Sequence, residues 1–472
     1  MVVDEADDEA ESEVETLVEP WRVKVVERMR LPSRAEREAH LHAADFSIFR
    51  IPSSAIFIDL LTDSGTSAMS DTQWGGLMVG DESYAGARGF IRFEQTVREM
   101  FGFPNVIPTH QGRAAENMLF STIVRPGTLI PGSNHFDTSR AHIENNGGEA
   151  LDLAIAEAAE LTSDHPFKGN VDLDRLRRVL EAATSGRIPV VTMTLTNNLS
   201  GGQPASLANI REVSSICRRH GIPFFIDACR FAENAYFIKH REEGQGHRTV
   251  AEIVREVFDL ADGCTVSAKK DGLVNIGGFV ACRDDELAKA IKKRLILVEG
   301  FPTYGGMAGR DLEALSIGLR EVVDEDYLRF RIGQVAFFGQ ALLDLGVEVV
   351  TPFGGHAIYI DAGALLPHIP AMRLPGIATI VELYREAGVR AAEFGTAMLG
   401  STNEAGVPFP AQAELVRLCV PRRVYTNSHL QYVAAALGKI RARASSVHGY
   451  CIVEKEPGPL GHFTARYEEL PV

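Results

Sequence analysis

The sequence predicts an α/β fold, with a large domain built on a mainly parallel sheet flanked by helices and a smaller α+β domain after it. In the middle of the chain, short β-branched apolar runs alternate with amphipathic segments, as in strand–helix–strand units. Near residue 325 this alternation gives way to a long helical segment. The 472 residues are 45% hydrophobic and 24% charged, which is typical of a globular protein with a sizeable core.

The clearest strand–helix pair of the large domain begins at residues 188–196, a β-branched and largely apolar run that suits a buried strand. Ser206 then stands at the N-cap position of a helix, and Gly221 is expected to end that helix. Three further strands of the same domain are predicted at residues 223–228, 263–268 and 277–282.

The segment from about residue 325 predicts the smaller α+β domain. The composition is uniform from Trp21 onward, and no Ser- or Pro-rich linker separates independent domains. The expected elements of the smaller domain are a helix around 326–345, strands near 348–361, a helix near 378–387 and a strand at 414–420.

Acidic residues are concentrated at the N-terminus. Residues 1–20 contain nine acids and no base, so they account for more than half of the net charge of −15. Such a segment is expected to be a disordered, solvated tail. No stripe of Lys and Arg stands out in the rest of the chain, so a nucleic-acid partner is not expected.

The cysteines and the hydropathy pattern indicate a cytoplasmic protein. The six cysteines are scattered, with no Cys-x-x-Cys pair, a usage that suits a reducing compartment. The N-terminus lacks the basic and then apolar pattern of a signal peptide. No run of about 20 apolar residues is present to span a bilayer, so no membrane partner is expected.

Three polar features stand where predicted strands or helices begin or end. Lys269 and Lys270 follow an apolar strand, Asp227 ends another, and Gly112 and Arg113 open an amphipathic helix. A helix N-terminus with a neighbouring Arg favours a phosphate group. A phosphate seat, a lysine that can form an imine and a carboxylate that keeps a pyridine nitrogen protonated are together what pyridoxal 5'-phosphate (PLP) requires. The sequence therefore predicts a PLP site.

Seven longer motifs accompany these residues, at 61–66 (Leu-Thr-Asp-Ser-Gly-Thr), 80–86 (Gly-Asp-Glu-Ser-Tyr-Ala-Gly), 108–113, 233–238, 267–271, 304–306 and 414–418. Through them the chain resembles the β-eliminating lyases of aromatic amino acids, which comprise the tryptophanases and the tyrosine phenol-lyases. The resemblance runs from about residue 24 to the C-terminus and implies the aspartate-aminotransferase type of PLP fold, fold type I. It divides the chain into a disordered acidic tail (1–20), an arm with part of the small domain (21–57), a large PLP-binding domain (58–324) and a small C-terminal domain (325–472).

The resemblance implies a role toward the cofactor for each matched residue. Lys270 would form the Schiff base, Phe136 would stack on the pyridine ring and Asp227 would pair with the ring nitrogen. Arg230 would lie near the ring oxygen, and Asn198 would also contact the cofactor. The phosphate would be held by Gln111, Gly112, Arg113, Ser267 and Lys269.

The resemblance also implies contacts to the substrate and to a cation. Asn198 and Arg417, with Ser64, would bind the substrate α-carboxylate, Arg417 through a two-pronged, charge-assisted contact. Tyr84 would act as an acid near the leaving group, contributed across a subunit boundary of a homotetramer built as a dimer of dimers. A monovalent cation such as K⁺ would be bound by the side chain of Glu82 and by the carbonyls of Gly65 and Asn275.

Three positions separate the two branches of the family. Tyrosine phenol-lyases carry an Arg where this chain has Phe394, which can pack on an indole but cannot donate to a phenol oxygen. Asp137 and His462 match the tryptophanases, and Phe463 is expected beside them at the substrate. Protonation of indole at C3 builds positive charge that an anion and an imidazole can relieve. The predicted reaction is therefore β-elimination of L-tryptophan to indole, pyruvate and ammonia.

Other readings stay open. The chain could instead be a tyrosine phenol-lyase or a β-lyase for another modified aromatic amino acid, and the small Ala392 beside the leaving-group pocket predicts room for ring-substituted tryptophans. A non-catalytic scaffold that binds a partner through its acidic tail is a further alternative, but it has no need for Lys270, Asp227 and Arg417 together. Cys229 departs from the small or hydroxyl residue of the family and is interpreted as a packing residue.

Overall fold

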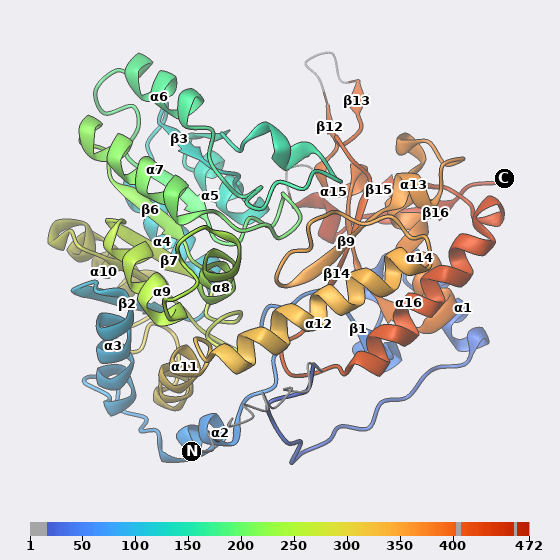
Figure 1. The fold of residues 1–472 in the computed structure, drawn as a ribbon, viewed down its shortest axis with the longest axis horizontal. Coiled ribbons are helices and arrows are strands. Elements are labelled where there is room, and N and C mark those ends of the chain that lie inside the picture. The colour runs from blue at the N-terminus through green and yellow to red at the C-terminus, as the bar shows by residue number, and fades with distance from the viewer. Residues whose placement is uncertain (1–16, 403–406, 457–459, 472) are drawn as a thin grey trace, which may run out of the picture.

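The computed structural model describes residues 17–402, 407–456 and 460–471, and residues 1–16 of the predicted acidic tail lie outside this range. A larger half of the molecule contains the elements from α2 to α11, and a smaller half contains the C-terminal elements together with α1 (Figure 1). Helix α12 (Glu325–Asp344) runs from the larger half into the smaller one. In the described part of the chain no helix is long and apolar enough to cross a membrane.

A seven-stranded mixed sheet forms the centre of the larger half. Its strand order is β2-β8-β7-β6-β5-β3-β4, and every neighbouring pair is parallel except those of β8, which runs antiparallel to both β2 and β7. The prediction of a mainly parallel sheet is thereby confirmed. The strands are β2 (Asn105–Thr109), β3 (Leu129–Gly132), β4 (Glu149–Asp152), β5 (Val191–Thr194), β6 (Phe224–Asp227), β7 (Gly263–Val266) and β8 (Gly278–Cys282).

Some predicted strands are shorter than expected because their last residues leave the sheet to form loops. The run 188–196 keeps ladder pairing only over β5, and Asn197 beyond it pairs with Gln203 in a separate turn. The run 263–268 likewise ends at Val266, since the Ser267 carbonyl already accepts the Lys270 N–H in the following turn. The carboxyl ends of these strands are therefore free to carry a site.

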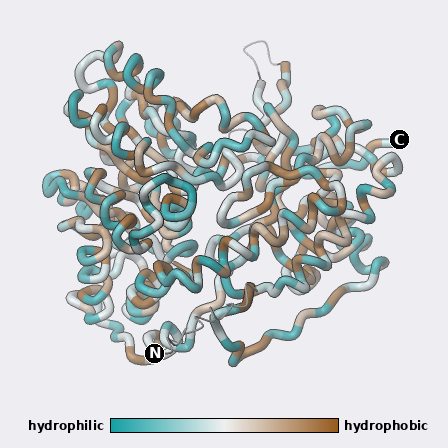
Figure 2. Tube along the Cα trace, in the orientation of Figure 1, coloured by the Kyte–Doolittle hydropathy of each residue, from teal (hydrophilic) through white to brown (hydrophobic). Residues whose placement is uncertain are grey.

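Helices cover both faces of this sheet. On β8, Phe279 belongs to the hydrophobic cluster of one face and Val280 to that of the other, as expected for alternate residues of a strand. Figure 2 shows hydrophobic and hydrophilic residues side by side along these helices. One face packs on α3 (Arg88–Phe101), α6 (Leu173–Ala182), α7 (Leu207–His220), α8 (Phe231–Arg241), α9 (Val250–Asp259) and α11 (Gly309–Glu321), and the other on α4 (Gly112–Ile123), α5 (Asp137–Asn145) and α10 (Asp285–Val298).

Helix α7 begins and ends where the sequence predicts. The Ser206 hydroxyl accepts the N–H of Asn209, which satisfies one of the unpaired donors at the helix N-terminus. Gly221 ends the helix at φ +64°, in the left-handed region that glycine adopts without a Cβ clash.

The smaller half is organised around a three-stranded antiparallel sheet of order β11-β14-β9. The predicted helix at 326–345 is α12, and the predicted strand at 414–420 is β14. Residues 348–361 form strand β9 at their end, and Val349 pairs with Ile360 of that strand in an isolated antiparallel bridge, because Pro352 and the Gly354–Gly355 pair interrupt the extended chain between them. The elements are α1 (Arg34–Ala43), β9 (Ala357–Asp361), α13 (Ala362–Leu365), α14 (Pro375–Ala387), β11 (Ala392–Phe394), α15 (Thr396–Leu399), β14 (Leu415–Cys419) and α16 (Asn427–Ala442).

Several short elements complete the fold. Helix α1 joins the core of the smaller half, where Leu41 is fully buried. Strand β1 (Ile58–Asp59) pairs in parallel with β10 (Val389–Arg390), which ties the chain before the larger half to the smaller one. Helix α2 (Asp71–Val79) packs on α11. Two further antiparallel strand pairs are β12–β13 (Ser401–Thr402 with Pro408–Phe409) and β15–β16 (Tyr450–Glu454 with Arg466–Glu469).

Candidate functional site

A cavity of about 410 Å³ opens where the two halves meet, at the carboxyl ends of β5, β6 and β7. The larger half contributes strand-end residues such as Thr194 and Asp227, and the smaller half contributes Phe394 and Arg417 from its sheet. The cavity brings together most of the predicted site residues, namely Ser64, Gln111, Gly112, Arg113, Phe136, Asp137, Asn198, Asp227, Arg230, Ser267, Lys269, Lys270, Phe394, Arg417, His462 and Phe463.

The N-terminus of α4 forms one end of the cavity. A Cβ atom on Gly112 would lie 2.4 Å from the Cβ of Ser267, so only glycine lets the helix start pack so closely on the loop after β7. Lys269 Nζ donates to Gln111 Oε1 over 3.2 Å. Burial, followed by the charges of Lys270 and Arg113, lowers the pKa of Lys269. This cluster of cations at a helix N-terminus suits a phosphate group, which would relieve their mutual repulsion.

Asp227 and Lys270 lie in the middle of the cavity. Burial raises the pKa of the Asp227 carboxyl, and the nearby Lys270 only partly offsets this effect. A protonated pyridine nitrogen would supply the missing positive partner, so the pair fits PLP. Cys229 is buried beside them, and burial raises the pKa of its thiol to about 12, which agrees with its interpretation as a packing residue rather than a reactive thiol.

Asn198 and Arg417 form the part of the cavity shared by both halves. Asn198 Oδ1 accepts from the Tyr359 hydroxyl at 2.5 Å, from His356 Nε2 at 3.0 Å and from Arg417 Nη1 at 3.3 Å. With its oxygen held by three donors, the amide offers its NH₂ group as a donor to the cavity. Among the described residues, the buried Nε of Arg417 has no hydrogen-bond partner. Both groups therefore suit a carboxylate ligand.

Arg230 is held by an aspartate that sequence reasoning did not assign a role. Its guanidinium donates to both carboxylate oxygens of Asp63, at 2.9 and 2.8 Å. Burial alone would raise the pKa of Asp63, but the charges of Arg230 and Arg422 hold it well below its usual value. The two partners are 167 residues apart in the chain, so no local pattern could reveal the pair.

The leaving-group end of the cavity is largely apolar. The Arg417 guanidinium lies 4.3 Å from the centroid of the Phe394 ring, and Tyr359 contacts the same ring edge-on at 5.8 Å. Although it lies near a chain end, His462 is buried, and its Nε2 is 4.0 Å from Asp137 Oδ2. Burial raises the pKa of Asp137. Phe49, Met398 and Phe463 complete this wall.

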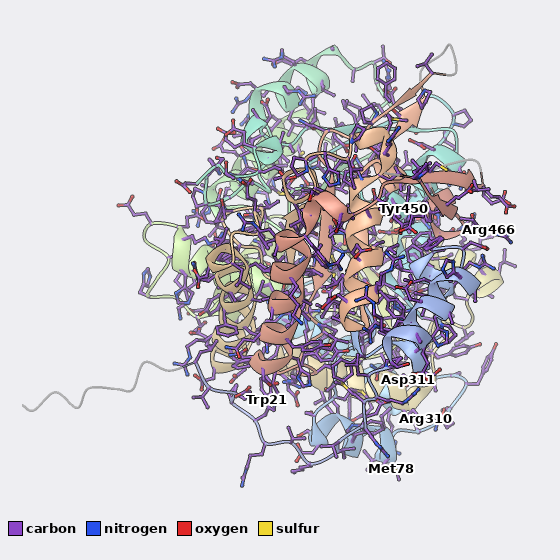
Figure 3. The ribbon with its side chains drawn as sticks, turned by 90° about the vertical axis from the view of Figure 1, so that its right-hand side faces the viewer. Trp21, Met78, Arg310, Asp311, Tyr450 and Arg466 are labelled. Atoms are coloured by element: carbon purple, nitrogen blue, oxygen red, sulfur yellow. The ribbon has the colours of Figure 1, made fainter. Side chains whose placement is uncertain are left out.

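Four predicted residues do not line the cavity. Tyr84 is 68% exposed and packs against Phe301 and Tyr304. Glu82 pairs with Arg310 at 2.9 Å, and Figure 3 shows Arg310 near Met78 at the lower end of the molecule. Within the described residues no hydrogen bond joins Glu82 to the other two predicted cation ligands, Gly65 and Asn275. These two contact each other instead, the side chain of Asn275 donating to the Gly65 carbonyl over 3.0 Å.

The cavity also contains residues that the sequence analysis did not select. Glu116 and Thr138 line it, as do Phe49 and Met398. Glu116 follows Gly112 by four positions on α4, and the i, i+4 spacing of a helix could have placed it on the same side. Phe49 and Met398 belong to a short 3₁₀ turn and a four-residue helix, whose positions no sequence pattern fixes.

Sequence comparison gives the family. A sequence profile described as β-eliminating lyase matches residues 59–436. The chain belongs to the β-eliminating lyase family. It is 54% identical to a tryptophanase of Hyphomonas neptunium, over 97% of this chain and 100% of that protein. A tryptophanase of Salinibacter ruber is 53% identical over 96% and 95% of the two chains, and a tyrosine phenol-lyase of Symbiobacterium sp. is 46% identical over 96% and 98%.

Solved structures with low sequence identity share the fold of this β-eliminating lyase. A SepCysS–SepCysE N-terminal domain complex aligns with a TM-score of 0.56 at 14% identity, covering 83% of this chain and 96% of that one. A serine palmitoyltransferase of S. paucimobilis with a bound PLP-myriocin aldimine aligns with a TM-score of 0.54 at 13% identity, covering 82% and 88%. The predicted PLP fold type I is thereby confirmed, and with the family it identifies a PLP-dependent carbon–carbon lyase.

Proposed function

We propose that this lyase eliminates indole from L-tryptophan and leaves pyruvate and ammonia. The observation that carries the proposal is the leaving-group end of the cavity, where Phe394 offers an aromatic face and Asp137 lies beside His462. Three relatives at 53–54% identity are named tryptophanases, which supports the same substrate.

In this proposal the cofactor end of the cavity holds PLP. Its phosphate would rest on Gly112, Arg113, Ser267 and Lys269, and its ring nitrogen would face Asp227. When bound, PLP supplies a protonated ring that accepts the electrons of the carbanion at Cα.

The residues around the substrate would then act on defined atoms. Arg417 and the NH₂ group of Asn198 would bind the α-carboxylate and so hold the Cα–H bond toward the amine of Lys270, which removes the proton. At the other end, the Asp137–His462 pair would relieve the positive charge that builds as C3 of the indole is protonated. The apolar wall would exclude water until the Cβ–C bond breaks.

A substrate assay tests the proposal. L-tryptophan is expected to give indole and pyruvate in equal amounts, while L-tyrosine releases no phenol, since Phe394 cannot donate to a phenol oxygen. Robust phenol release would contradict the assignment. Reduction with borohydride is expected to fix the cofactor on Lys270, and a Lys270→Ala variant should give neither product nor trapped cofactor.

Ring-substituted tryptophans form a second candidate substrate class. Ala392 lines the cavity and is only 5% exposed, so a larger side chain there would take space from the leaving group. An Ala392→Leu variant is expected to lose activity toward ring-substituted tryptophan more than toward tryptophan. An unchanged ratio of kcat/KM between the two substrates would rule this class out.

We further propose that the active enzyme is a homotetramer in which Tyr84 reaches the cavity of a neighbouring subunit. Its exposure and its position outside the cavity of its own chain support this arrangement. A mixture of Tyr84→Phe and Lys270→Ala subunits, dissociated and reassembled together, is expected to recover activity that neither variant has alone. No recovery in mixed tetramers would place Tyr84 and Lys270 of the same chain in one site.

The same arrangement would complete a site for a monovalent cation. Glu82, two residues before Tyr84, would join the carbonyls of Gly65 and Asn275 from the neighbouring subunit. Activity is expected to rise when K⁺ replaces tetramethylammonium in the buffer, and Glu82→Gln should remove that response.

A further inference from the structure

Glu116 is a buried acid that lines the cavity but has no part in the proposed elimination. Its carboxylate accepts two hydroxyl hydrogen bonds, one from Thr138 to Oε2 at 2.7 Å and one from Ser139 to Oε1 at 2.8 Å. Both hydroxyls belong to the first turn of α5, the helix that begins at Asp137. The side chain of Glu116 thus connects α4 to the start of α5.

Hydrogen bonding extends from Thr138 to Asp137, which lies beside His462 at the leaving-group end of the cavity. The N–H of Thr138 donates to Asp137 Oδ1 over 2.6 Å, and Asp137 Oδ2 lies 4.0 Å from His462 Nε2. Glu116, the hydroxyl and backbone N–H of Thr138, Asp137 and His462 therefore follow one another, and all four residues line the cavity. Since the Thr138 hydroxyl is fixed by Glu116, its backbone N–H, and with it the Asp137 carboxylate, is held in one position.

The support of this series is rigid. Helix α4 starts at Gly112, where no Cβ atom would fit against Ser267, so the start of the helix packs directly on the loop after β7. Glu116 is one helical turn further along α4 and is 8% exposed. A carboxylate on such a support can fix the position of a neighbouring helix N-terminus, which also favours a negative charge.

Two simpler roles have to be separated from this one. Glu116 could serve only as a cap of α5, in which case its two hydroxyl contacts would be equivalent. It could also act on the cofactor, because burial and the neighbouring Asp227 raise its pKa to about 7 and Lys270 lies close enough to oppose that rise. Either role would affect every substrate alike.

We propose that Glu116 is a positioning residue that, through Thr138, holds Asp137 in place for the departure of the indole. This inference rests on the proposed function, because it needs a leaving group that depends on the Asp137–His462 pair. An S-aryl cysteine provides the contrast. When its Cβ–S bond breaks, the electron pair stays on sulfur as a stable arenethiolate, so no carbon of the leaving group has to be protonated. The remaining fragment is hydrolysed to pyruvate and ammonia with both substrates.

Two matched variants test the inference in the holoenzyme. Thr138→Val and Ser139→Ala each remove one of the two hydroxyls that donate to the Glu116 carboxylate. Of these two residues, only Thr138 also donates its backbone N–H to Asp137. Thr138→Val is expected to lower kcat for tryptophan by about tenfold or more, while kcat for an S-aryl cysteine stays within about threefold. Ser139→Ala should leave both substrates within about threefold of the unmodified enzyme. Indole and arenethiolate release are followed directly, and the cofactor absorbance checks that each variant binds PLP.

Glu116→Gln is a second variant that keeps the shape of the side chain. Its amide oxygen can accept only one of the two hydroxyls and its NH₂ group must donate to the other, so one charge-assisted hydrogen bond is lost and a smaller selective loss toward tryptophan is expected. Equal losses with both substrates, or equal effects of Thr138→Val and Ser139→Ala, would overturn the inference. If the unmodified enzyme cleaves the S-aryl cysteine but releases no indole from tryptophan, the proposed function itself fails, and the inference falls with it before any variant is compared.

Discussion

At the scale of single residues, the orientation of the Asn198 amide depends on Tyr359. The Tyr359 hydroxyl makes the shortest of the three hydrogen bonds to Asn198 Oδ1, and its neighbour in that contact, His356, is kept neutral because burial and Arg230 lower its pKa well below the usual value. The Tyr359 hydroxyl and the Nε2–H tautomer of His356 thus hold the amide oxygen, which leaves the NH₂ group of Asn198 for the cavity.

We expect a Tyr359→Phe variant to raise KM for tryptophan by about tenfold, with a smaller change in kcat, because the amide becomes free to turn its oxygen toward the substrate carboxylate. Steady-state kinetics at fixed pH measure both parameters. Tyr327→Phe is the matched control, since the Tyr327 hydroxyl is also buried but has no hydrogen-bond partner among the described residues. A similar change of KM in both variants would contradict the role of Tyr359.

The residues that could be predicted are those whose chemistry is visible in the sequence. Lys270 and Asp227 stand at strand ends, and Arg417 lies in a motif that the family shares. Glu116 and Asp63 were missed because their importance arises from burial and from partners distant in sequence, Thr138 in one case and Arg230 in the other. A single sequence records neither burial nor such pairing.

At the scale of secondary-structure elements, the junction of α4 with the loop after β7 is the tightest feature of the predicted phosphate seat. We expect Gly112→Ala to weaken PLP binding strongly, since the added methyl group would overlap Ser267 and move the helix start. Titration of the apoenzyme with PLP, followed by absorbance, measures the change. Gly75→Ala in α2 is the control, because a Cβ atom there meets nothing within 4 Å. Equal PLP affinity in both variants would contradict the proposed seat.

The segment that carries Phe394 is stabilised by a pair of buried acids. Glu393 accepts the N–H groups of Ala397 and Met398 at the start of α15, and Glu414 accepts that of Thr396. Burial, followed by the charge of Glu414, raises the pKa of Glu393 from 4.5 to about 8. The protonated form is therefore favoured in the folded protein over a wide pH range.

This raised pKa predicts how stability depends on pH. The contribution of Glu393 is fully present below pH 4.5, the usual pKa of the unfolded chain, and is lost as pH rises toward about 8, because the folded protein must then give up a proton that burial favours. The melting temperature of a Glu393→Gln variant should fall less between pH 6 and 9 than that of the unmodified protein. Parallel melting curves would show that Glu393 titrates normally.

The limits of prediction at this scale also have physical causes. Periodicity located α12 and β14 well, because each has a regular apolar pattern on a supporting core. Residues 348–350 still pair with β9, but from Thr351 the chain turns toward the larger half, where the Thr351 N–H donates to the Leu161 carbonyl. Such a contact between halves overrides local strand propensity.

At the scale of the whole molecule, Arg422 joins the two halves. It follows β14 of the smaller half and donates to three buried carboxylates, those of Asp63, Glu233 and Asp271, at 2.8–2.9 Å. Asp271 comes directly after Lys270, so the network lies behind the predicted Schiff-base lysine.

We expect Arg422→Met to destabilise the protein by about 3–5 kcal/mol, because it leaves the buried Asp271 without an ion-pair partner and removes one of the two arginines that pair with Asp63 and with Glu233. Chemical denaturation of the holoenzyme measures the loss. Arg329→Ala serves as the control, since Arg329 pairs with Asp326 while both side chains are largely exposed, and such pairs contribute little. Equal stability of the Arg422→Met variant would show that the network contributes no net stabilisation.

The placement of the cavity across the two halves has a consequence for turnover. The residues proposed to bind PLP, such as Asp227 and Lys270, belong to the larger half. Arg417 and Phe394, which would bind the amino acid, belong to the smaller half. A small rotation of one half against the other would therefore release the reaction products while PLP remains bound to the larger half. One bound PLP molecule would in this way serve many catalytic cycles.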